Sequence, residues 1–286
     1  FNLTAQARGA VFGKKEQTPT TSIKIKPNTN MPIPPLPTAP GDYADDWKIV
    51  DSLEQQGLYK SALEKVEAIQ ARARGDKNAP QSVKAILFRG KFITMLEEDG
   101  LVKSIQLLEK EILEAKKPEK SVLQSMLGQL YATYLQSQGW NLRQRTPIPD
   151  GEGGDILTWS AAQIEKRALD LYSASIEEPA AMLKEFRLES FKDILTPGSN
   201  DSVQNTPLRP TIYDLLAHRA LDHFVNERSY LTEPAYAYQV DQSIAFAPAE
   251  DFVKAVFETK DSTSGKWLAI KLFQKVVYYH LFSQGD

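Results

Sequence analysis

The side chains best suited to chemistry gather in one short segment, which holds Asp214, His218, Asp222 and His223. Carboxylate and imidazole groups placed together can bind a metal ion or transfer protons. His218 and His223 are five residues apart, which separates them by roughly 140° around a helix, whereas paired zinc ligands on a helix usually stand four apart. Asp214 and His218 share a helix face, but no nucleophile accompanies them. The pattern therefore favours packing and a local hydrogen bond over a catalytic or metal site.

The rest of the sequence contains no common catalytic or cofactor-binding motif. It has no glycine-rich phosphate loop, serine elbow or zinc signature, and the absence of cysteine excludes thiolate chemistry. The acidic, glycine-rich stretch 150–155 lacks EF-hand spacing and is expected to be a surface loop. Glu109, Glu111 and Glu114 are expected on a solvated helix face beside Lys110. We therefore predict a protein without enzymatic activity, cofactor or metal.

Helices must position these residues, because apolar side chains recur at helical spacing from Tyr43 onward. The apolar stripes, and the glycines that end them, predict five helices between Tyr43 and Gly139, joined by short connections. After an interruption at 140–159, further helices are expected from Thr158 and over about 179–195, 211–226, 249–258 and 266–282. Short connections make neighbouring helices antiparallel.

An internal repeat spans the ends of the first and third predicted helices. The segment from Glu54 to Ser61 returns as Glu97 to Ser104, which matches Gly57 to Gly100 at an offset of 43 residues. A helix–turn–helix unit repeated at such a period is typical of an α-solenoid.

The residues of the repeat resemble those of tetratricopeptide hairpins. Gly57 tolerates the positive φ of a helix corner, Ala62 lets two helices cross closely, and Tyr59 fills the space between hairpins. Gly100 has the same place in the second copy, and Gly128 is expected to permit close packing of a later helix. The offset exceeds the usual tetratricopeptide period of about 34 residues, so the units are irregular. We predict an all-α fold of TPR-like helical hairpins stacked as an α-solenoid over 43–286, with a possible subdivision near 140–160.

Residues 1–42 form a separate segment that is rich in proline and threonine. Proline disfavours helix, so this segment is expected to be an extended arm. Val11, Phe12, Ile23 and Ile25 are its candidate anchors for docking on this chain or on a partner. The alternative is a flexible linker.

Composition limits the partners of the chain. A net charge of −3 gives no reason to expect nucleic acid, and no run of eighteen apolar residues could span a bilayer. Ala5-Gln6-Ala7 has the small-x-small form of a signal cleavage site, which is a hint of export.

Several segments together resemble the N-terminal helical region of alpha-2-macroglobulin family proteins of Bacteroidetes-type bacteria. The resemblance covers about 46–286 and rests on Trp47 to Val66, Arg209 to Leu221, Pro234 to Tyr238 and Phe246 to Pro248. It implies a long exported protein of the periplasm or outer membrane, built mainly of β-sandwich domains, some of whose members trap proteases through an internal thioester. That thioester needs a cysteine, which this chain lacks. The resemblance therefore implies an attachment or scaffolding module with a protein partner in the cell envelope.

The sequence is compatible with two other functions. A free-standing TPR-like adaptor would bind an extended peptide on its concave face. A helical-toroid carbohydrate-active enzyme would need paired acids in a cleft.

Overall fold

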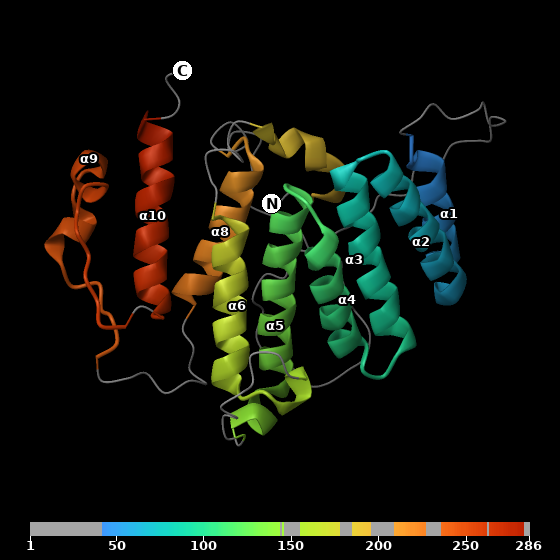
Figure 1. Ribbon diagram of the computed structural model, residues 1–286, viewed down its shortest axis with the longest axis horizontal. Coiled ribbons are helices and arrows are strands. Elements are labelled where there is room, and N and C mark those ends of the chain that lie inside the picture. The colour runs from blue at the N-terminus through green and yellow to red at the C-terminus, as the bar shows by residue number, and fades with distance from the viewer. Residues whose placement is uncertain are drawn as a thin grey trace.

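A computed structural model of the chain describes residues 42–143, 145, 155–177, 185–195, 209–226, 236–261 and 263–282. Its α-helices are α1 (Ala44–Gln55), α2 (Tyr59–Gly75), α3 (Ala79–Leu96), α4 (Gly100–Glu114), α5 (Glu119–Arg143), α6 (Ala161–Ser175), α8 (Ile212–Val225), α9 (Ala249–Phe252) and α10 (Gly265–Phe282) (Figure 1). Among the described residues, three 3-10 helices accompany them, namely η2 (Ile156–Thr158), η3 (Leu188–Ile194) and η5 (Ser243–Phe246). The described residues contain no β-strand, only an isolated antiparallel bridge between Arg187 and Thr211. The all-α prediction is confirmed.

The long helices lie in a row, and each packs mainly on the next in sequence, from α1 to α6, then α8 and α10 (Figure 1). Contacts between helix ends show that neighbours run antiparallel. Asp46, in the first turn of α1, pairs with Arg72 near the end of α2 at 2.7 Å. Asp214, near the start of α8, lies 3.0 Å from His280 near the end of α10. The row therefore places α1 at one end of the molecule and α10, with α9 beside it, at the other.

Local sequence explains where several helices begin. The side chain of Asn78 accepts a hydrogen bond from the Gln81 backbone at the start of α3. Ser160 and Gln163 form a reciprocal capping box at the start of α6, and Thr211 and Asp214 form another at the start of α8. These side chains satisfy backbone N–H groups that a helix start leaves without partners.

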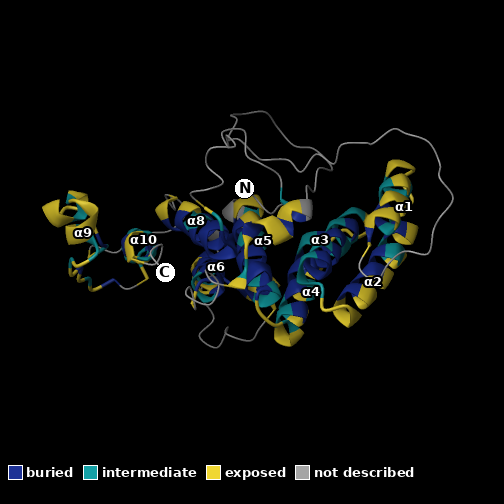
Figure 2. Ribbon diagram, turned by 90° about the horizontal axis from the view of Figure 1, so that it is seen from above, coloured by how far each residue is buried: buried dark blue, intermediate teal, exposed yellow. Residues whose placement is uncertain are grey.

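The core follows the faces that neighbouring helices share, and it falls into two larger clusters (Figure 2). The first joins α1, α2 and α3 and includes Trp47 and the fully buried Ala62. The second runs from α3 to α10 and includes Tyr131 and Tyr172. Burial is densest in the middle of the row, whereas α9 is mostly exposed (Figure 2).

The three glycines singled out in the sequence suit their positions for different physical reasons. Gly57 has a φ of 74° between α1 and α2, in a conformation that favours glycine. Gly100 does not have a positive φ; a Cβ there would stand 2.4 Å from the Thr94 Cα, so close backbone approach requires the glycine. At Gly128 a Cβ would stand 3.0 Å from the Tyr172 ring, where α5 meets α6.

Two predicted helices are shorter in the structure than the sequence suggests. The helix expected over 179–195 is replaced at its end by η3, because the backbone of Phe186 and Leu188 bonds to Ile212 and Pro210 instead of continuing a helix. The helix expected over 249–258 ends at Phe252. The predicted arm, the loop 150–154 and the start of the 179–195 segment lie outside the described residues.

Candidate docking surface around the last helix

Of the two histidines that suggested chemistry, His218 bonds within α8 and His223 contacts α6. The Nδ1 of His218 donates to the backbone oxygen of Asp214 at 2.7 Å, as expected for residues four apart on a helix. Burial lowers the pKa of His218, and nearby Arg209 lowers it further, so the fold favours the neutral imidazole. His223 points elsewhere: its Nε2 lies 3.1 Å from Oε1 of the buried Glu165.

Asp214 is the most enclosed carboxylate of this group. Its Oδ2 accepts hydrogen bonds from the backbone N and the hydroxyl of Thr211 at 3.1 and 2.8 Å, and its Oδ1 lies 3.0 Å from His280 Nε2. No local pattern in the sequence indicates the contact with His280, which is 66 residues away. Within the described ranges, no group of three His, Asp or Glu side chains could hold a metal ion. The arrangement caps α8 and fastens α10 to it.

One predicted surface is wrong, because Glu111 is buried and not part of a solvated face. Its carboxylate pairs with Arg74 and Arg89 and accepts a hydrogen bond from Gln70 at 3.0 Å. The donors come from α2 and α3, so the sequence of α4 alone does not indicate them. This network joins three helices.

The surface most suggestive of function is that of α10. Its sequence is apolar on every side and carries Lys266, Lys271 and Lys275 but no Asp or Glu. A helix that is apolar all round is normally covered on all sides. Here, however, Phe273, Tyr278 and Phe282 are 43%, 51% and 55% exposed. The helix therefore presents large apolar side chains that the described part of the chain leaves uncovered.

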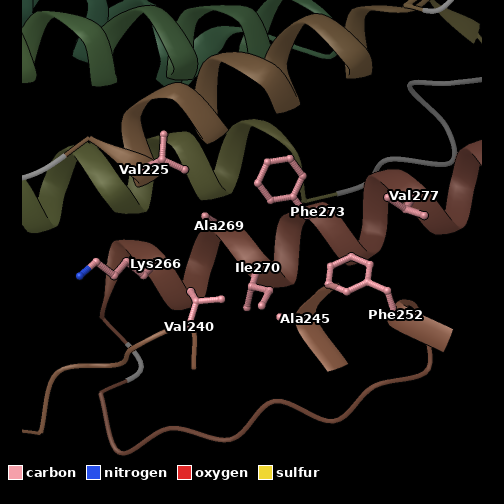
Figure 3. Close-up of a pocket in the computed structure, with 9 residues that line it drawn as sticks. All are labelled: Val225, Val240, Ala245, Phe252, Lys266, Ala269, Ile270, Phe273 and Val277. Carbon is pink, nitrogen blue, oxygen red and sulfur yellow. The ribbon is translucent and has the colours of Figure 1, made fainter. Parts of the chain in front are cut away.

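One side of α10 borders a hollow of about 360 Å³, which we call the apolar groove (Figure 3). Its walls come from the end of α8, from α10 and from the segment that carries η5 and α9. The lining residues are Val225, Val240, Ala245, Phe252, Lys266, Ala269, Ile270, Phe273 and Val277. The side-chain amide of Gln274 fixes one wall, since it donates to the backbone oxygens of Phe252 and Ala255 at 2.9 and 2.8 Å.

A second hollow, of about 650 Å³, lies on another side of α10, and we call it the basic cleft. Its far wall is the end of α6 and the two residues after it, Ile176 and Glu177, and Phe224 of α8 also contributes. On α10 it is lined by apolar residues beside two lysines, namely Trp267, Leu268, Lys271, Leu272 and Lys275. Volumes of this size are typical of ligand-binding clefts in proteins.

None of the candidate residues that the structure describes lines either hollow. Val11, Phe12, Ile23 and Ile25 lie outside the described residues. Gly57, Tyr59, Ala62, Gly100 and Gly128 lie at corners and contacts within α1 to α6, away from α10. A usable signal for α10 was present in the sequence, because 265–282 combines twelve or so apolar and aromatic residues with lysine and no acid.

Comparisons with known proteins give no further guide to this surface. The chain matches no protein-family model, no curated protein and no solved structure. In the part of the chain that the structure describes, no helix is both long and apolar enough to cross a membrane.

Proposed function

We propose that the chain is a non-enzymatic protein-interaction module whose helical hairpins form a TPR-like α-solenoid. The observation that carries this proposal is the exposed apolar surface of α10, the helix that lines both hollows. Exposed apolar patches of this kind are found at interaction sites more often than on surfaces that bind nothing. The sequential packing of antiparallel helices supports the solenoid description, because such stacks bury a core only between neighbours and need their end helices covered.

The proposal extends to the setting that the sequence resemblance implies. We propose that the module is the N-terminal helical part of an exported alpha-2-macroglobulin family protein and binds a protein of the cell envelope. A free-standing adaptor with the same surface is the second candidate. The two differ in what accompanies the module in the intact gene product, which mass spectrometry of the protein from its native host would measure.

Partner retention tests the interaction role. The chain would be immobilised and exposed to extract from its native host, alongside the variants Phe273→Asp and Leu113→Asp. Phe273 lines the apolar groove, whereas Leu113 is an equally apolar side chain on α4 that is 83% exposed. We expect a protein that the parent chain retains to be lost by Phe273→Asp and kept by Leu113→Asp. Equal retention by both variants would contradict a role for this surface.

A further inference from the structure

The basic cleft has more charged side chains than the apolar groove, in which Lys266 is the one charged lining residue. Lys271 and Lys275 stand one helical turn apart on the same wall, and Glu177 across the cleft is the one carboxylate among the lining residues. Neither lysine forms an ion pair within the described residues. The Nζ of Lys271 lies 5.9 Å from the Trp267 ring centroid, a cation–π contact that leaves the ammonium group available to an anion.

The apolar residues of the cleft have the spacing of a helix-packing surface. On α10, Trp267, Leu268, Lys271, Leu272 and Lys275 recur every three or four residues and form one stripe along the helix. A second helix laid along such a stripe presents its own side chains at the same interval. A ligand that matches both the stripe and the lysines needs apolar residues on one face and acids beside them.

We propose that the basic cleft binds an acidic amphipathic helix of a partner protein. Apolar side chains of that helix pack between α6 and α10, against Ile176, Phe224 and Leu272, while its carboxylates face Lys271 and Lys275. Charge complementarity identifies the partner as acidic, because the α10 wall of the cleft carries Lys271 and Lys275 and no acid. An anionic membrane fits less well, since a bilayer surface does not fill a concave cleft and the chain as a whole has a net charge of −3. This inference rests on the proposed function and names the kind of partner.

A pair of synthetic peptides tests the proposal directly. The first is an amphipathic helix with a leucine face flanked by glutamates, and the second has lysine in place of every glutamate. Binding to the full chain would be measured by fluorescence anisotropy. We expect the glutamate peptide to bind at least about tenfold more tightly than the lysine peptide, with the difference shrinking as salt is added.

Charge-reversal variants locate the binding. The double variant Lys271→Glu with Lys275→Glu should lower the affinity for the glutamate peptide at least about tenfold. Lys110→Glu on α4 should change that affinity less than about twofold. Circular dichroism and thermal unfolding would verify that each variant folds. Should the double variant unfold, Lys271→Gln with Lys275→Gln removes the charges more gently and should give a smaller loss in the same direction.

Three results would overturn the proposal. They are equal binding of both peptides, binding of neither, and glutamate-peptide binding that the double variant leaves unchanged. Vesicles of phosphatidylcholine with and without phosphatidylglycerol supply the membrane comparison; vesicle binding that depends on both lysines, without peptide binding, would assign the cleft to lipid. If a native partner still depends on Phe273 while the glutamate peptide fails to bind, the interaction role stands and the acidic-helix inference falls.

Discussion

His280 Nε2 lies 3.0 Å from Asp214 Oδ1, and through this contact α10 is attached to the capping box that begins α8. Asp214 is fully buried, so its side chain depends on Thr211 and His280 for hydrogen bonds. The contact matters for the docking surface because it fixes the position of the helix that lines both hollows.

Replacing that carboxylate should cost stability. Asp214→Ala removes an N-cap interaction and the acceptor for His280, which together should lower the free energy of unfolding by about 2–4 kcal/mol. Asp170→Ala is the matched control, since Asp170 pairs with Lys166 on an exposed helix surface and should change stability by less than about 0.5 kcal/mol. Urea unfolding would measure both variants. A similar effect for the two would mean that the buried contact does not hold α8 and α10 together.

The network around the buried Glu111 predicts that replacing Glu111 costs more stability than replacing the nearby Glu114. Glu111→Ala removes the carboxylate that Arg74 and Arg89 share, while Arg89 keeps Glu67, and should destabilise the fold by about 1–3 kcal/mol. Glu114, one turn further on α4, is exposed and lies 3.8 Å from Arg74 Nη1, so Glu114→Ala should have little effect. Thermal unfolding of the two variants compares them directly, and an unchanged midpoint for Glu111→Ala would contradict the network.

Two glycine substitutions distinguish a glycine that close packing requires from one that has open space around it. Gly100→Ala places a methyl group 2.4 Å from the Thr94 Cα and should cost about 1–3 kcal/mol or more. At Gly75, which ends α2, a Cβ meets nothing within 4 Å, so Gly75→Ala should be neutral or stabilise by up to about 1 kcal/mol. Loss of stability at Gly75 and none at Gly100 would reverse this expectation.

The partly buried His218 predicts that stability depends on pH. Its pKa is lowered in the fold, so its contribution to stability is present above the unfolded pKa of about 6.5 and is lost as pH falls through the lower folded pKa. His218→Gln removes this titration. The variant should therefore lose less unfolding free energy than the parent between about pH 7 and pH 5. Parallel losses in the two proteins over that range would show that His218 is not the group responsible.

The sequence predicts the helices better than the surface they form. Apolar stripes place α10 at 266–282, within one residue of its observed start at Gly265, because periodicity depends on local spacing alone. Glu111 was assigned to the wrong environment because its partner Gln70 lies 41 residues away on another helix. The apolar groove could not be predicted either, since Val225, Val240 and Phe273 come together only when three separate segments pack. Gly100 shows the same limit, because an equivalent place in a repeat does not give it the backbone conformation of Gly57.

Site-specific photo-cross-linking in the native host tests most directly whether α10 is the docking surface. A photoreactive side chain would be placed at Phe273, at Tyr278 and, for comparison, at the exposed Leu113 and Ile49. The account predicts that a defined protein adduct forms at Phe273 and Tyr278 and that none forms at Leu113 or Ile49. Adducts only at Leu113 or Ile49, or equal labelling at all four positions, would contradict it.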